Sequence, residues 1–332
     1  MQGLQYFHAA TMMRNHLFLL AGLMLCIGGS AYAQKSGTES SSSGRAYRLQ
    51  ALYRAGVAQS YEITEQTTVE RTHSDSSKKT YDRTITYFTT IRCIESMDGI
   101  SKLVVNIDSL RYRFTAEGKM IQYDSQEDIT PKNFADLNNY IGPLNRPYTI
   151  TVSPYGELSG LEGEQIQFWR DYLAENSEGL DSVIYLIWSQ SLDEENLYQY
   201  GDLQKRVIPG LRIEQDSSWD LNLSLRVDGV VYSGSTQATF SDYSGGMYSL
   251  TVNDTIPVVE GQKIHVYDVP YITTVAEGTA IVDHTVKLSA TGTIQDVTSA
   301  VSAWFRGRVV NEVFTQKITS TTSWKLTGQY QW

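Results

Sequence analysis

The chain has 332 residues, of which 41% are hydrophobic and 19% are charged, a composition typical of a folded globular protein. Lys and Arg together number 27 against 37 Asp and Glu, so the formal net charge is -10 at pH 7. This acidic balance, without a block of basic residues, argues against binding to nucleic acid phosphates. One long apolar run, near the N-terminus, does not fit an integral helical membrane protein with several spans.

The first 33 residues predict a secretory signal peptide. Arg14 precedes an apolar run of eleven residues at 17–27, and the sequence Ala-Tyr-Ala at 31–33 has the A-x-A pattern of a cleavage site. A helix needs about 20 apolar residues to cross a bilayer, so the run suits a cleaved signal better than a retained anchor. We therefore expect cleavage after Ala33 and export to the periplasm or the extracellular space.

Two further features follow from this assignment. Residues 1–12 hold no Lys or Arg, which leaves open a translation start at Met12 or Met13 instead of Met1. Cys26 leaves with the signal, so Cys93 is the one cysteine of the mature chain and no intramolecular disulfide is expected.

The mature chain is expected to have three parts. Residues 34–45 are rich in serine and predict a flexible linker. Residues 46–205 form an N-terminal β-rich half with helices, and residues 206–332 form a C-terminal antiparallel β half.

Alternation of apolar and polar residues predicts strands in the N-terminal half. Between residues 81 and 94, one face carries Ile85, Tyr87, Ile91 and Cys93. Asp98-Gly99 is a strong hairpin signal that follows this strand. Further strands are expected at 61–71, 103–107 and 111–123, the last with a turn at Glu117-Gly118.

The middle of the chain changes to helical spacing between Thr130 and Tyr200. The first helix is expected to start at Thr130-Pro131 and to end at Gly142. A second helix is expected between residues 163 and 179, and a third begins after Asp181, whose carboxylate suits an N-cap.

The C-terminal half is predicted to consist of strands alone. Their expected positions are 221–227, 230–240, 247–252, 280–290, 293–305 and 308–322, with a turn between the last two at Arg306-Gly307. The predicted fold class is therefore α+β, mainly β: two curved antiparallel sheets, half-barrel-like, with a helical segment in the middle.

Several short motifs occur in a characteristic order. YTITVS at 148–153 runs into GEL at 156–158 and LEG at 161–163, and Ile208-Pro209 precedes Ser-Ser-Trp at 217–219. This order resembles a family of uncharacterised exported bacterial proteins with two curved β-rich halves. In that family the tryptophan usually closes a Gly-Asp-Ser-Trp stretch, whereas Asp216 and Ser217 stand in this chain for the glycine and the aspartate. The resemblance implies location and fold, since the family has no assigned activity.

By analogy of architecture, curved sheets covered by helices are also similar to the periplasmic lipoprotein carriers, whose concave face holds acyl chains. This analogy suggests an apolar ligand or a lipid.

Known catalytic motifs are missing from the sequence. It contains no G-x-S-x-G, no G-x-x-x-x-G-K-[ST] and no H-E-x-x-H, so we expect neither an enzyme nor a cofactor nor a metal site. Of the three histidines of the mature chain, His73 lies in a polar loop. His284 falls on an apolar strand face between Val282 and Val286, where a hydrogen-bonded core histidine is the favoured interpretation. Together with His265 it is the remaining candidate for a metal ligand or a catalytic base.

Aromatic residues give the candidate binding site. They lie on the apolar stripes of the predicted helices and are Phe134, Trp169, Tyr172 and Trp188. If the helices pack loosely on a sheet, these side chains would line an apolar pocket. The alternative interpretation is that they belong to an ordinary core.

The leading hypothesis is an exported, non-enzymatic module that binds an apolar small molecule or a lipid. One alternative is a structural or assembly protein that binds envelope protein partners through sheet edges. A further alternative is an outer-membrane β-barrel, because apolar residues alternate from Trp324 to the final Trp332, although the helical middle argues against it.

Overall fold

The computed structural model describes residues 46–128, 134–201, 208, 212–310 and 312–332. The predicted signal peptide, the linker at 34–45 and the expected helix start at Thr130-Pro131 lie outside the described residues. The chain divides after Ser43 into two units, and the described residues belong to the second unit. Among them, no helix combines the length and the apolar character needed to cross a membrane.

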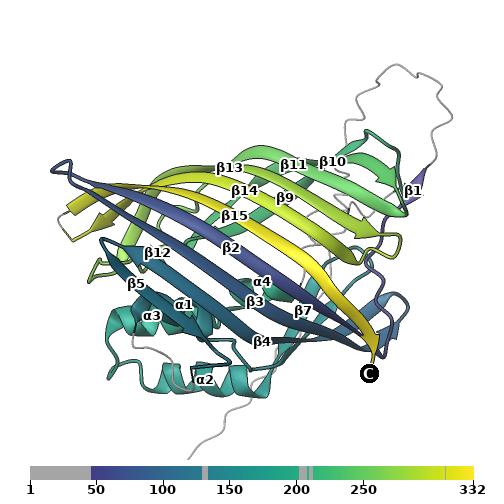
Figure 1. Ribbon diagram of the computed structural model, residues 1–332, viewed down its shortest axis with the longest axis horizontal. Helices are drawn as coiled ribbons and strands as arrows, with labels where there is room; N and C mark the ends of the chain where they lie inside the picture. The colour runs from purple at the N-terminus through teal and green to yellow at the C-terminus, as the bar shows by residue number, and fades with distance from the viewer. Residues whose placement is uncertain (1–45, 129–133, 202–207, 209–211, 311) are drawn as a thin grey trace, which may run out of the picture. The chain divides into compact units, whose positions relative to one another are not determined.

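A single antiparallel sheet of 13 strands dominates the described unit (Figure 1). Its strand order is β7-β6-β4-β3-β2-β15-β14-β13-β11-β10-β9, with β5 paired to β4 and β12 paired to β13. The strands of the N-terminal half are β2 (Val57–His73), β3 (Lys78–Met97), β4 (Ile100–Ala116), β5 (Lys119–Asp124), β6 (Tyr148–Val152) and β7 (Leu158–Glu162). Those of the C-terminal half are β9 (Ser218–Val227), β10 (Val230–Ser244), β11 (Met247–Pro257), β12 (Lys263–Ile264), β13 (Thr273–Ser289), β14 (Ile294–Val309) and β15 (Glu312–Gln331).

The last strand joins the two halves. β15 pairs with β2 from Gln331 opposite Val57 to Phe314 opposite His73, so the predicted halves share one continuous sheet. The sheet is curved, and its end strands β7 and β9 are not paired with each other, which leaves it open rather than closed into a barrel. Separately, β1 (Tyr47–Arg48) pairs with β8 (Arg212–Ile213). The mainly β, α+β class predicted from the sequence is confirmed.

Pleating sorts the side chains of the long strands onto two faces. In β14, Val297, Val301 and Phe305 are buried on the inner face, whereas Thr298 and Ser302 between them are exposed. Threonine and charged residues occupy most of the exposed positions of β13 and β15 in the same way, although Ile281 and Val313 are exposed there too. The inner face therefore carries the core, and the outer face suits water.

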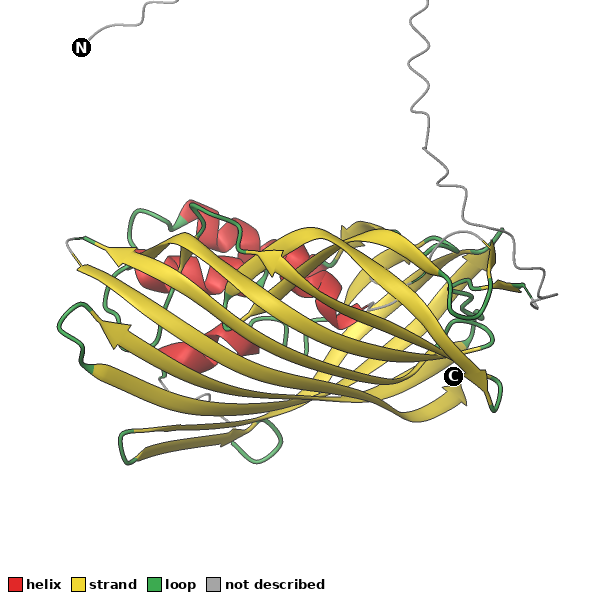
Figure 2. Ribbon diagram, turned by 90° about the horizontal axis from the view of Figure 1, so that it is seen from above, coloured by secondary structure: helices red, strands yellow, loops and turns green. Residues whose placement is uncertain are grey.

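Four helices of the described unit lie together on one side of the sheet (Figure 2). They are α1 (Ala135–Ile141), α2 (Glu164–Glu175), α3 (Ser182–Ser191) and α4 (Glu194–Gly201). Asp181 caps α3 as predicted, because its carboxylate accepts hydrogen bonds from the backbone N–H groups of Val183 and Ile184 at 2.9 and 3.2 Å. The first helix ends at Gly142 as predicted, but it begins at Ala135, later than the expected start.

The predicted turn at Arg306-Gly307 is wrong. Strand β14 continues to Val309, and the chain turns at Val310, which has a φ of 46°. Gly307 has a different role, since a Cβ at this position would come within 2.5 Å of Cζ of Phe314 on the paired strand. The glycine makes room for the phenylalanine ring and does not reverse the chain.

The segments expected as separate strands at 103–107 and 111–123 also differ from the prediction. Residues 100–116 form one strand, β4, whose pairing with β3 shifts register where Ser109 faces Phe88 and Ile107 faces Thr89. The predicted turn at Glu117-Gly118 is confirmed and leads into β5.

The segment before β2 closes one end of the sheet. Leu49 and Ala51 are completely buried. The backbone N–H of Ala51 donates to the carbonyl of Pro154, and that of Leu52 donates to the carbonyl of Thr291, both at 2.9 Å. This segment ties the ends of strands that are distant in sequence.

Candidate functional site

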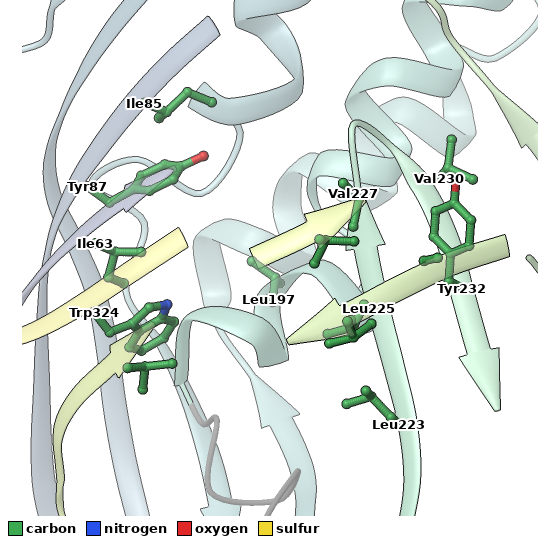
Figure 3. Close-up of a cluster of buried hydrophobic side chains, with 14 of the residues drawn as sticks. Ile63, Ile85, Tyr87, Leu197, Leu223, Leu225, Val227, Val230, Tyr232 and Trp324 are labelled. Atoms are coloured by element: carbon green, nitrogen blue, oxygen red, sulfur yellow. The ribbon is translucent and has the colours of Figure 1, made fainter. Parts of the chain in front are cut away.

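A cavity of about 130 Å³ lies between the inner face of the sheet, helices α1, α3 and α4, and the turn that joins β9 to β10. Its volume is close to that of an engineered cavity of about 150 Å³ that binds benzene. Ile63, Tyr87 and Trp324 from the middle of the sheet point toward Leu225 and Val227 of β9 (Figure 3). These side chains give the cavity an apolar wall on either side.

Polar side chains line the cavity as well, interspersed among the apolar ones. The side chains of Glu65, Asp136, Asp228 and His265 line it, together with Tyr81. A cavity with apolar walls and a few convergent polar groups is the usual form of a small-molecule site in proteins.

Asp228 reaches this cavity from a hairpin turn. Asp228 and Gly229 have φ values of 51° and 78°, the positive angles that a tight turn between β9 and β10 requires. Turns of this kind are usually exposed, but only 6% of the Asp228 side chain is accessible to solvent. Because β9 ends the sheet while β3 lies in its middle, contact between Asp228 and β3 shows how far the sheet curls.

Two side chains of the sheet donate hydrogen bonds to the Asp228 carboxylate, and a third forms an ion pair with it. Nη2 of Arg83 lies 2.8 Å from Oδ1. The Tyr81 hydroxyl and Nε2 of Gln316 donate to Oδ2 at 2.7 and 2.8 Å. Both oxygens are therefore bound by donors from β3 and β15 rather than from the hairpin itself.

Arg83 is the centre of a wider buried cluster. Its side chain is 1% exposed, its Nη1 lies 3.2 Å from Oδ1 of Asp136, and its Nη2 lies 3.8 Å from Oε1 of Glu65. The guanidinium also lies over the ring of Tyr140, 4.9 Å from its centroid. Tyr112 donates to Oδ2 of Asp136 at 2.6 Å. The cluster thus ties α1 and the β9–β10 turn to the sheet.

The Gln316 amide is held in one orientation. Arg71 donates from Nε to Oε1 of Gln316 at 3.1 Å and from Nη2 to the carbonyl of Tyr267 at 2.6 Å. With its oxygen engaged by Arg71, the amide of Gln316 presents its NH₂ group to Asp228. Arg71 is therefore a positioning residue for the site.

Burial sets the protonation behaviour of the cluster. Removal from water raises the pKa of the Asp228 carboxyl, an effect that Arg83 partly offsets. Burial alone would lower the pKa of Arg83, but Tyr140, Asp136 and Asp228 raise it well above its ordinary value. Burial and the nearby Asp228 raise the pKa of Tyr81, which keeps its hydroxyl a neutral donor at physiological pH.

Both histidines singled out in the sequence line the cavity. His284 is 2% exposed and lies between buried Val282 and Val286, as the alternation predicted. Burial lowers the pKa of His265, so this ring is neutral near pH 7. Among the described residues, no group of three or more His, Cys, Asp and Glu side chains is arranged to hold a metal ion.

The four aromatic residues predicted as a pocket lie outside the cavity lining. Phe134 packs against Phe114, with ring centroids 5.1 Å apart. Trp169 packs edge-on against Tyr172 at 5.6 Å, and Tyr172 is 43% exposed. Trp188 is partly buried against the core. The structure does not bring the four residues together as one wall, and their role in binding stays a prediction.

The donors around Asp228 were not among the residues singled out from the sequence, although part of the signal was there. Arg83 follows the same period-two pattern as Ile85 and Tyr87, so a charged residue stood on an apolar strand face. The Asp-Gly pair at 228–229 indicated a turn. Nothing in the sequence indicated that this turn folds back onto β3, because that contact depends on the curvature of the whole sheet.

The model of a family described as "Family of unknown function (DUF6263)" matches residues 98–295, more than half of the chain. The protein belongs to this family. The matched region includes Asp136 and Asp228, whereas Tyr81, Arg83 and Gln316 lie outside it. No curated protein matches the sequence.

Several solved structures show distant likenesses. Lipovitellin, from a structure titled "Lipid-protein interactions in lipovitellin", shares 10% identity with a TM-score of 0.44; the match covers 84% of this chain and 26% of lipovitellin. Neisserial surface protein A shares 7% identity with a TM-score of 0.20, over 81% of this chain and 98% of that one. An outer membrane channel from Pseudomonas putida F1 shares 8% identity with a TM-score of 0.23, over 84% and 97%. This chain spans about a quarter of lipovitellin, and scores this low carry no functional argument.

Proposed function

We propose that this protein is an exported, non-enzymatic binding module that shelters the apolar part of a small amphipathic molecule. The observation that carries the proposal is the cavity between the sheet and its helical cover, which is lined by both apolar and polar side chains. Ile63, Tyr87 and Trp324 are buried side chains among the apolar ones. Moving apolar surface from water into such a cavity is favourable by about 25 cal/mol per Å².

A binding role is supported by the state of the ionisable groups. Arg83 is ion-paired with Asp136 and Asp228, and the hydroxyl of Tyr81 and the amide of Gln316 donate to the Asp228 carboxylate. Buried pairs of this kind are suited to holding an oriented polar group. His265 is kept neutral by burial and has no described carboxylate bound to it that would orient it as a base.

Export is part of the proposal and rests on residues 1–33. Their charged start, apolar run and A-x-A sequence are those of a signal peptide. The intact mass of protein isolated from the cell envelope should correspond to a chain that begins at Gln34. A chain that retains residues 14–33 would contradict this part of the proposal.

Filling the cavity should weaken binding. Val297 lines the cavity beside Trp324, its partner in the β14–β15 register, whereas the next residue, Thr298, points outward. We expect the Val297→Phe variant to bind 1-octanol at least about tenfold more weakly than the wild type, because the larger ring takes up the space for the alkyl chain. Titration followed by tryptophan fluorescence measures this affinity.

Thr298→Phe is the matched control, since it adds the same ring to the outer face of the same strand. It should bind octanol as the wild type does. Equal affinity in all three proteins would show that the cavity is not the binding site, and would favour the alternative of an assembly protein that binds envelope partners through its sheet edges.

A further inference from the structure

The donors around Asp228 form a carboxylate receptor that belongs to the sheet. Arg83 and Tyr81 lie on β3 and Gln316 lies on β15, and their polar atoms converge on one carboxylate at 2.7–2.8 Å. The carboxylate itself comes from a separate element, the tip of the β9–β10 hairpin. Receptor and occupant are therefore held together by these contacts and not by continuity of the chain.

The chemistry of the receptor is specific for an anion with two oxygens. Oδ1 faces the guanidinium of Arg83, and Oδ2 accepts from the Tyr81 hydroxyl and the Gln316 amide. Charge-assisted hydrogen bonds of this kind are stronger than neutral ones and match the geometry of any carboxylate. Asp228 satisfies this receptor, but nothing in the donor set requires the carboxylate to come from the protein.

The receptor adjoins the cavity through Tyr81 and Asp228. Tyr81, Asp228 and Gly229 line it, as do the apolar Ile63 and Leu225, whereas Arg83 and Gln316 contact Asp228 and are not lining residues. A molecule with a carboxylate at one end and an alkyl or aryl group at the other would meet the receptor and the apolar side chains at once.

We propose that the cavity binds carboxylate-bearing amphiphiles, whose headgroup replaces Asp228 on Arg83, Tyr81 and Gln316 when the β9–β10 turn withdraws. This inference rests on the proposed function, since it names the class of ligand for the same cavity. The displaced Asp228-Gly229 turn then becomes solvent-exposed, as Asp-Gly hairpin turns usually are.

Charge balance favours this exchange over other headgroups. When one carboxylate replaces another, the charge of the buried cluster is unchanged and Arg83 keeps its partner. An ammonium head would face the Arg83 guanidinium, and a hydroxyl head would leave that buried charge incompletely paired. Asp136 and Glu65 stay in place in each case, at 3.2 and 3.8 Å from Arg83.

Three ligands with the same tail test the inference: octanoate, 1-octanol and octylammonium, each titrated and followed by tryptophan fluorescence. The Asp228→Gly variant removes the carboxylate that occupies the receptor, and glycine readily adopts the positive φ of this position. We expect its affinity for octanoate to be at least about tenfold higher than that of the wild type, with octanol affinity unchanged.

Asp98→Gly is the matched control. Asp98-Gly99 forms the same kind of turn, with φ values of 53° and 80°, but Asp98 is exposed. This variant should bind octanoate as the wild type does.

A second substitution tests the Tyr81 hydroxyl as a donor to the ligand. Tyr81→Phe in the Asp228→Gly background should weaken octanoate binding about tenfold and leave octanol binding unchanged, since only a donor hydroxyl is lost.

The possible results separate the two proposals. If octanol binds but octanoate gains nothing in Asp228→Gly, or if octylammonium binds best, the headgroup inference is overturned while the proposed function stands. If none of the three ligands binds either protein, both proposals fail. Circular dichroism of each variant establishes that it retains the β-sheet signal of the wild type.

Discussion

At the scale of single residues, the account depends on a carboxylate that is buried next to an arginine. Asp228 is buried at the tip of a hairpin, and burial raises its pKa above the ordinary value of 3.8. The folded state therefore holds the Asp228 proton more tightly than the unfolded state does. The free energy of unfolding that this group contributes is largest at low pH and falls as the pH rises from about 3.8 through the pKa of the folded state.

Asp228→Asn tests this linkage, because asparagine keeps the shape of the side chain and does not titrate in this range. The difference in free energy of unfolding, wild type minus variant, should decrease as the pH rises above 3.8. Denaturant unfolding at a series of pH values measures it. A difference that grows with pH would mean that Arg83 lowers the pKa of Asp228 more than burial raises it.

At the scale of elements, the buried segment before β2 fixes the end of the sheet, and one glycine makes that packing possible. Gly292 has a φ of 74°, and a Cβ at this position would collide with the carbonyl group of Gln50. Gly246 has a similar φ of 79° but open space around it. An alanine would therefore meet the same unfavourable positive φ at both positions, but it would meet crowding by other atoms only at Gly292.

Comparing the two alanine variants separates the cost of the positive φ from the cost of disturbed packing in the free energy of unfolding. Gly246→Ala should cost about 1 kcal/mol, the usual penalty for alanine at a positive φ. Gly292→Ala should cost about 3 kcal/mol or more, because segment 49–52 must also shift. Denaturant midpoints give both values. Equal losses would indicate that this segment is free to move and does not close the end of the sheet.

At the scale of the whole molecule, local sequence patterns were enough to predict most helices and strands, but they did not predict how these elements pack and pair with one another. Alternation located most strands and the inward-facing His284, and Asp181 marked the start of α3. The pairing of β15 with β2 joins residues more than 200 positions apart, and no local pattern indicates such a partner. The position of Gly307 illustrates the same limit, since its role is visible only beside Phe314.

The candidate site was less predictable for the same reason. Period-two spacing alone places Arg83 on the inner face, but its partners come from α1, the β9–β10 turn and β15. The sequence placed the predicted pocket on the aromatic stripes of the helices. The cavity is instead lined by the inner face of the sheet and by other residues of α1, α3 and α4. Tertiary curvature decides which side chains converge.

The central claim is that the interior of this protein holds an amphipathic molecule. Native mass spectrometry of the protein isolated without detergent from its own cells tests this claim most directly. We expect the protein to carry an additional mass that organic solvent releases as a carboxylate-bearing amphiphile, and we expect the Val297→Phe variant to lack it. A wild-type protein that shows only the mass of its own chain, under conditions that preserve its fold, would contradict the account.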